Sequence, residues 1–153
     1  MKLRLVLVGK NAPGPLTQAL EEMLERVRRS APVEVHVVPE ITSGEVDHKR
    51  KVGTQRLLEA VKDDAMVVLL DERGKQFTSE GFAAQLGRWR DQGTRTVTFV
   101  VGGAYGVEEP LRQRAQLVLA LSSMTFPHQL VRAFLAEQLY RAFSILDGRP
   151  YHH

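Results

Sequence analysis

The 153-residue sequence contains no cysteine. This absence excludes disulfide scaffolds, thiolate nucleophiles and cysteine-based zinc sites, and it is typical of proteins in a reducing compartment. We therefore expect a cytoplasmic location. Long hydrophobic runs are also missing, because charged residues interrupt the apolar N-terminus Met1-Lys2-Leu3-Arg4-Leu5. The sequence accordingly predicts neither a signal peptide nor a membrane span.

Several catalytic motifs are absent as well. The chain has no Gly-x-Ser-x-Gly elbow, no His-Glu-x-x-His sequence, no phosphate loop ending in Gly-Lys-Ser/Thr, and no histidines at metal-ligand spacing. Hydrolase hypotheses therefore have no nucleophile, and we expect no metal site. The formal net charge of +3 permits an anionic partner without identifying one.

The chain does contain enough apolar residues, 43%, to fill one compact core. Short runs rich in valine and leucine have the length of buried strands. They are Leu3–Val8, Val33–Val38, Met66–Leu70, Val97–Val101 and Leu117–Leu121. Segments with helical spacing of apolar residues lie between and after them, at Leu16–Arg29, Lys49–Lys62, Ser79–Gln92 and about His128–Leu146. We predict a single α/β domain over residues 1–153, with a mostly parallel sheet flanked by helices on both faces.

The last predicted helix, His128–Leu146, has apolar residues around much of its circumference. One face of a sheet cannot bury all of them, so we expect a symmetric dimer through this C-terminal helix. Burial of the whole helix inside one domain is the alternative. His128 is interpreted as a cap of this helix and Ser79 as the cap of the preceding one. Pro39–Asp47 is the only candidate flexible loop.

Ligands of open parallel sheets bind beyond the carboxyl ends of the strands. Three segments follow predicted strands in the second half of the chain, namely Asp71–Lys75, Gly102–Gly106 and Ser122–Pro127. Glycine pairs after a strand permit positive φ and a close approach of the backbone to a ligand. The spacing of these glycines is not that of the dinucleotide fingerprint. A tight structural turn explains them equally well, and a solvated turn explains Asp71 and Glu72.

The order of several sequence pieces resembles a known family. The pieces are Leu-Leu-Asp-Glu-Arg-Gly-Lys at 69–75, Val-Val-Gly-Gly-Ala-Tyr-Gly at 100–106, Leu-Ser-Ser-Met-Thr-Phe-Pro-His-Gln-Leu-Val-Arg at 121–132 and Glu-Gln-Leu-Tyr-Arg-Ala at 137–142. Together with both ends of the chain, they make the sequence similar to the RlmH-like family of SPOUT RNA methyltransferases over essentially its whole length. Each piece alone is unspecific, whereas the combination is specific.

The resemblance implies a homodimer that uses S-adenosyl-L-methionine to methylate N3 of a pseudouridine in 23S ribosomal RNA, on assembled ribosomes. It also implies a trefoil knot in the C-terminal half, an exception to the rule that chains do not thread loops. A non-catalytic ribosome- or RNA-binding protein on the same scaffold is the alternative function. A small nucleotide-binding domain unrelated to RNA is a third.

Carried over residue by residue, the resemblance places the cofactor on the three segments already singled out. Its binding residues would be Leu70, Asp71, Gly102, Gly103, Leu121, Ser122, Ser123, Met124, Thr125, Phe126 and Pro127. The catalytic candidates are Tyr151 and His152 in the C-terminal tail, with Arg132 near the start of the last helix. The tail is interpreted as a flexible segment facing the substrate, with a frayed terminus as the alternative. The chain departs from the family at His153, where a larger basic residue is common.

Basic residues offer phosphate contacts in two further places. One is Lys49–Lys51 on a predicted helix, and the other is Arg112 with Arg114. Solvated helix faces explain both groups equally well, so the charge pattern does not choose between the two interpretations.

Overall fold

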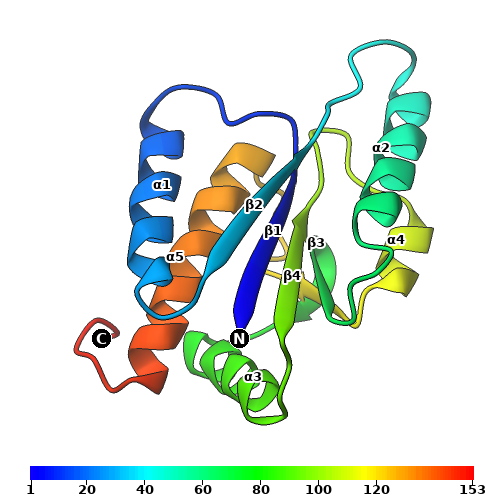
Figure 1. Ribbon diagram of the computed structural model, residues 1–153. Helices are drawn as coiled ribbons and strands as arrows, with labels where there is room; N and C mark the ends of the chain where they lie inside the picture. The colour runs from blue at the N-terminus through cyan, green and yellow to red at the C-terminus, as the bar shows by residue number, and fades with distance from the viewer.

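The five strands predicted from the apolar runs all form, and they pair in parallel in the order β2-β1-β4-β3-β5. The structure is a computed structural model that describes residues 1–153 (Figure 1). The strands are β1 (Lys2–Val8), β2 (Val33–Val38), β3 (Val67–Gln76), β4 (Thr96–Val101) and β5 (Leu117–Ala120). Parallel neighbours require crossover connections, which the helices provide.

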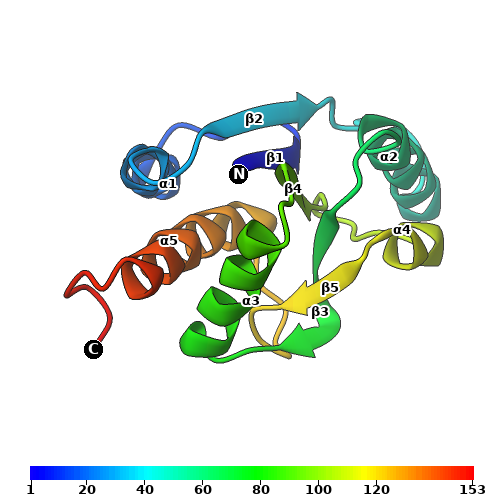
Figure 2. The ribbon, with the colours of Figure 1, turned by 60° about the horizontal axis from the view of Figure 1, so that its bottom comes forward.

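Helices cover both faces of the sheet, which confirms the predicted α/β class. They are α1 (Pro15–Arg28), α2 (Val46–Ala60), α3 (Ser79–Asp91), α4 (Glu109–Arg114) and α5 (His128–Leu146). Figure 2 shows α1, α3 and α5 on one side of the strands, with α2 and α4 on the other. The sequence did not predict α4, because six residues are too few to display a helical period.

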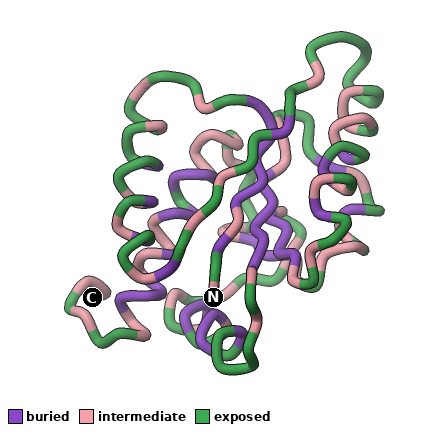
Figure 3. Tube along the Cα trace, viewed as in Figure 1, coloured by how far each residue is buried: buried purple, intermediate pink, exposed green.

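The core is divided by the sheet into two parts. Successive side chains of a strand point to opposite faces, so Leu3, Leu5 and Leu7 of β1 pack toward α1, α3 and α5. Val6 and Val8 of the same strand pack toward α2 and α4. Figure 3 shows the resulting band of buried residues along the central strands. None of the helices combines the length and apolar character needed to cross a membrane.

Strand β3 is longer than predicted. The sequence indicates a loop at Asp71–Lys75, but the strand continues to Gln76 and pairs with β5 a second time after an irregularity. Gly74 allows this, because a Cβ atom there would lie 2.5 Å from the carbonyl oxygen of Val118. The local sequence is typical of a turn, and the pairing with a distant strand leaves no local signal.

Both predicted helix caps are wrong. Thr78, not Ser79, caps α3, since its hydroxyl accepts a hydrogen bond from the N–H of Gly81 at 3.0 Å. No side chain caps α5, which begins directly after Pro127. The His128 side chain instead lines the cavity described below.

Helix α5 packs against α1 and α3 within the chain. These contacts bury Leu135, Leu139 and Phe143, whereas Phe134 remains 40% exposed. Internal burial therefore accounts for much of the apolar surface that suggested a dimer. The dimer stays a prediction, now restricted to the first turns of α5. The trefoil knot also stays a prediction.

Candidate functional site

A cavity of about 1130 Å³, here the main cavity, lies beyond the carboxyl end of β4, beside the irregularity in β3. A small cavity of about 60 Å³ adjoins it and shares part of its wall. Between them, the two cavities bring together every predicted cofactor residue except Ser123. The main cavity is lined by Leu70, Asp71, Gly102, Gly103, Thr125, Phe126 and Pro127 among others, and the small one adds Leu121, Ser122 and Met124.

Close packing, not positive φ, explains the first two glycines of the turn after β4. Of the three glycines in this turn, Gly106 alone has a positive φ, 78°, so the argument from positive φ is wrong for Gly102 and Gly103. A Cβ atom on Gly103 would lie 3.1 Å from Cγ1 of Val8, and one on Gly102 would lie 2.8 Å from Cγ1 of Val107. The backbone itself therefore forms the wall of the main cavity at this turn.

The segment Ser122–Phe126 has backbone N–H and C=O groups that are available for a ligand. None of its N–H or C=O groups joins a backbone–backbone hydrogen bond, and the N–H of Met124 bonds only the hydroxyl of Ser122, at 3.1 Å. Backbone polar groups need partners wherever water is excluded. This segment is therefore suited to bind the polar edge of a planar heterocycle, with Leu70 and Phe126 as apolar walls.

Asp71 does not lie in a solvated turn. Its side chain is 6% exposed and accepts hydrogen bonds from Nε of Arg112 at 2.8 Å and from the N–H of Arg73 at 2.9 Å. Arg112 also donates to the carbonyl oxygen of Val107 at 3.2 Å, and Arg114 donates to two backbone carbonyls at the end of α2. Both arginines proposed as phosphate contacts therefore hold α4 in place.

Arg132 is completely buried, behind the start of α5. Its Nη1 donates to Oδ1 of Asn11 at 2.7 Å, and its Nη2 donates to the carbonyl oxygens of Val8 and, at 3.1 Å, Gly9. Its Nε has no partner. Burial lowers the pKa of Arg132 from its ordinary value, and the charge of Glu40 opposes this shift. The guanidinium thus ties the start of α5 to the end of β1. Arg132 is therefore a residue that positions α5.

His128 is a titratable group of the cavity wall that sequence reasoning treated as a cap. Burial lowers the pKa of His128 below its ordinary value, and the charge of Arg132 lowers it further, while Glu40 acts in the opposite direction. A neutral imidazole is able to accept a proton. The position of His128 directly after the loop Ser122–Pro127 was the signal that could have identified it.

The lowered pKa of His128 predicts a pH-dependent stability. The unfolded chain, with a His128 pKa near 6.5, binds more protons than the folded one as the pH falls. Stability should therefore be lost as the pH decreases from about 6.5 toward the folded pKa, and this contribution should stop changing below it. Urea unfolding of the wild type and His128→Gln, between about pH 7.5 and about pH 5, tests this. The variant should show the weaker pH dependence, and parallel curves would contradict the shift.

The C-terminal tail folds back onto α5 and is not extended. The ring of Tyr151 contacts that of Tyr140 edge-on, with centroids 4.6 Å apart. Its hydroxyl donates to Oε1 of Glu137 at 3.1 Å, and Arg141 donates to the same oxygen at 2.7 Å. Burial, followed by the charge of Glu137, raises the pKa of Tyr151. The tyrosine is thus docked and protonated at neutral pH.

Both ring nitrogens of His152 have partners in the docked tail. Nη1 of Arg141 lies 3.0 Å from Nδ1, and Oε1 of Glu80 lies 2.7 Å from Nε2. A guanidinium only donates, so Nδ1 must accept and Nε2 must carry the proton that is donated to Glu80. Figure 1 shows that the tail lies at the C-terminal end of α5, away from the start of that helix. Neither Tyr151 nor His152 lines the main or the small cavity.

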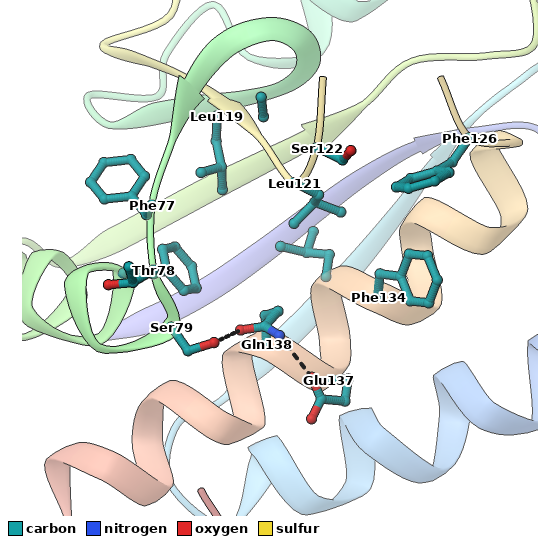
Figure 4. Close-up of a pocket in the computed structure, with 13 residues that line it drawn as sticks. Phe77, Thr78, Ser79, Leu119, Leu121, Ser122, Phe126, Phe134, Glu137 and Gln138 are labelled. Atoms are coloured by element: carbon teal, nitrogen blue, oxygen red, sulfur yellow. Dashed lines mark hydrogen bonds between the residues drawn. The ribbon is translucent and has the colours of Figure 1, made fainter. Parts of the chain in front are cut away.

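A side cavity of about 350 Å³ borders the last of the cofactor segments, with Leu121, Ser122 and Phe126 in its wall (Figure 4). It shares Leu121, Ser122 and Phe126 with the small cavity, and it shares Glu137 with the tail contacts. Its wall includes the half-exposed ring of Phe134, which meets the ring of Phe126 edge-on at 5.5 Å. The apolar surface that α5 leaves uncovered is therefore concentrated here.

Structural comparison shows where this fold occurs among solved proteins. A probable methylase family protein from Haemophilus influenzae aligns with 99% of this chain and 70% of its own, with a TM-score of 0.60 and 11% identity. A probable methyltransferase from Bordetella pertussis aligns with 92% of this chain and 95% of its own, with a TM-score of 0.57 and 12% identity. At these identities the likeness shows the fold alone.

Sequence comparison gives closer relatives. Proteins named ribosomal RNA large subunit methyltransferase H from Pelobacter propionicus and Geobacter metallireducens are 45% and 44% identical to the chain over 153 residues. The alignments cover 100% of this chain and 100% and 99% of the relatives. The family described as predicted SPOUT methyltransferase matches residues 1–152. The chain therefore belongs to the SPOUT methyltransferase family.

Proposed function

We propose that the protein methylates N3 of a pseudouridine in 23S ribosomal RNA, with S-adenosyl-L-methionine as the methyl donor and assembled ribosomes as the substrate. The observation that carries this proposal is the main cavity, which three separate segments build in a chain of the SPOUT methyltransferase family. The substrate class comes from the names of relatives that match along their full length. We propose that the enzyme acts in the cytoplasm.

The residues of the two cavities fit the proposed cofactor. Bare glycine backbone at Gly102 and Gly103 leaves room for a ligand to approach closely. The backbone groups of Ser122–Phe126, none of which bonds another backbone group, suit the edge of an adenine, and Leu70 with Met124 would cover its faces. When bound, S-adenosyl-L-methionine supplies an electrophilic methyl group on a sulfonium.

The protein's own contribution is mainly positional. Holding a nucleophile and a methyl donor in near-attack geometry supplies up to about 7–11 kcal/mol. The acceptor N3–H must also lose its proton, so a base or a group that stabilises negative charge assists. His128 in the cavity wall, Tyr151 and His152 are the titratable groups that we assign to this task, while Arg132 holds the start of α5 in place.

We further propose a homodimer through the first turns of α5. Phe134 and the side cavity form an uncovered apolar surface there. Within one chain, the docked tail reaches Glu137 and does not line the main cavity. A second copy provides a way to bring tail residues and cavity together.

Two measurements test the proposed function. Calorimetry should detect binding of S-adenosyl-L-methionine to the purified protein. Labelled cofactor supplied with ribosomes that lack the modification should then transfer its methyl group to a single pseudouridine of 23S ribosomal RNA. A protein that binds ribosomes but not the cofactor would be the non-catalytic alternative, and methylation of protein or DNA would overturn the substrate.

Tyr151→Ala should leave cofactor binding intact and lower turnover by about 100-fold or more, since assistance to proton transfer typically contributes about 100- to 10,000-fold. The physical reason is that Tyr151 lies outside the two cavities that fit the cofactor. Calorimetry and single-turnover methylation measure the two effects separately. Tyr151→Phe keeps the ring contact with Tyr140 and removes only the hydroxyl that bonds Glu137. Equal loss of binding and turnover in Tyr151→Ala would contradict this division of roles.

A further inference from the structure

An exposed tyrosine at the glycine turn after β4 has one cation against its ring and a second cation on its backbone carbonyl. Tyr105 is 39% exposed, and Nζ of Lys49 lies 4.8 Å from its ring centroid and 3.4 Å from its hydroxyl oxygen. Nε of Arg50 donates to the carbonyl oxygen of Tyr105 at 2.9 Å. Both cations belong to the first turns of α2. Two elements distant in sequence thus build one surface, here called the Tyr105 platform.

The Tyr105 platform borders the main cavity. Tyr105 and Arg50 both line it, together with the backbone of Gly102 and Gly103. A substrate base that reaches a methyl donor in this cavity would lie close to these lining residues. The platform is therefore in the right place to hold the part of the substrate next to the reacting base.

The fold does not require an aromatic residue at position 105. The turn is closed by a backbone hydrogen bond from Gly106 to Gly103 at 3.2 Å and by Arg50 on a backbone oxygen. Any L-residue satisfies these contacts, because Tyr105 has no positive φ. The ring is partly covered but leaves 39% of the residue exposed, so a face able to stack is its distinctive chemical property.

The carboxylates near the Tyr105 platform leave its two cations able to bind a phosphate. Nη1 of Arg50 lies 3.0 Å from the carboxylate of Asp47, which is 94% exposed. Such solvated pairs contribute little free energy, so a phosphate is able to displace the carboxylate. Glu108 and Glu109 also line the main cavity, and Glu109 pairs with Arg112 at 3.4 Å.

We propose that the Tyr105 platform binds a single-stranded RNA nucleotide that flanks the methylated one. The base stacks on the face of Tyr105 that Lys49 does not occupy, and Lys49 and Arg50 bind its phosphate. Aromatic stacking combined with basic side chains is the usual recognition of unpaired RNA. A single ring among charged groups lacks the contiguous apolar area that protein partners bury. The inference rests on the proposed function, because it takes RNA as the substrate.

The test compares variants of the full-length protein for binding to a labelled single-stranded oligouridylate and for KM with unmodified ribosomes. Tyr105→Leu should weaken RNA binding about 10-fold, since stacking of one base on an aromatic ring is worth that much or more. Tyr105→Phe should bind like the wild type. Lys49→Gln should weaken binding. It should also make the slope of log K against log salt concentration shallower, by about the amount that one phosphate contact contributes. Asp47→Asn should tighten binding, and Lys62→Gln, far from the platform, is the matched control.

Wild-type RNA affinity in Tyr105→Leu would overturn the proposal. So would a loss of S-adenosyl-L-methionine binding in Tyr105→Leu without a loss of RNA binding, because Tyr105 would then belong to the cofactor site. Unchanged RNA binding together with lost binding of a ribosomal protein would assign the platform to a protein partner. Failure of the proposed function would give a different result. The wild type would then bind no S-adenosyl-L-methionine, while the effect of each variant on RNA binding could still be measured.

Discussion

Gly103→Val is expected to abolish binding of S-adenosyl-L-methionine, with a dissociation constant raised at least about 100-fold, or about 2.7 kcal/mol. A Cβ atom added at this position would lie only 3.1 Å from Cγ1 of Val8, which is itself buried in β1. The two further methyl groups of valine must therefore turn into the main cavity or push the glycine turn away from β1. Either change removes the surface on which we place the ribose or methionine part of the cofactor.

Calorimetry with S-adenosyl-L-methionine measures this effect, and urea unfolding separates it from general destabilisation. Gly53→Ala is the matched control, because Gly53 is helical and no atom lies within 4 Å of an added Cβ. That control should bind the cofactor normally. Gly103→Ala should retain weakened binding, since Val8 needs to move by only a few tenths of an ångström. Wild-type affinity in a folded Gly103→Val protein would show that the cofactor does not contact this turn.

The strands and most helices were predictable because their signals are local. Val33–Val38 and His128–Leu146 were predicted with the bounds that the structure shows, since apolar runs and helical spacing are read from neighbouring residues. The extension of β3 was not predictable, because it depends on Gly74 meeting the backbone of β5. Short α4 has no period to detect, although its Arg112 fixes Asp71 at the cavity.

The site was predictable in its segments but not in its side-chain roles. The resemblance and the strand-end rule both indicated the turns after β4 and β5, and the structure brings them together around one cavity. The burial of Arg132 and the docking of His152 between Glu80 and Arg141 were not visible, because both depend on contacts between distant parts of the chain. A basic residue next to a loop looks the same in sequence whether it faces RNA or the interior.

Arg132→Met should destabilise the protein by about 2–4 kcal/mol and also weaken cofactor binding. Methionine fills a similar volume, but the carbonyl oxygens of Val8 and Gly9 and the amide oxygen of Asn11 lose their donor. Each unsatisfied buried polar group costs about 1–3 kcal/mol. Removal of a buried charge without a bonded carboxylate recovers part of that cost, so the net effect stays below the full sum.

The cofactor effect of Arg132→Met follows from where the lost hydrogen bonds lie. The guanidinium ties α5 to β1, and the segment that precedes α5 forms part of the main cavity. Urea unfolding measures the stability, and calorimetry measures the cofactor affinity. Arg28→Met, on the exposed face of α1, is the control, and its stability should lie within about 0.5 kcal/mol of the wild type. The stability and cofactor affinity of Arg132→Lys should lie between those of the wild type and Arg132→Met, because one ammonium cannot reach all three oxygens. If Arg132→Met instead kept full stability and cofactor affinity but lost turnover, Arg132 would be a catalytic residue that acts on the substrate, and its buried position would have to change when RNA binds.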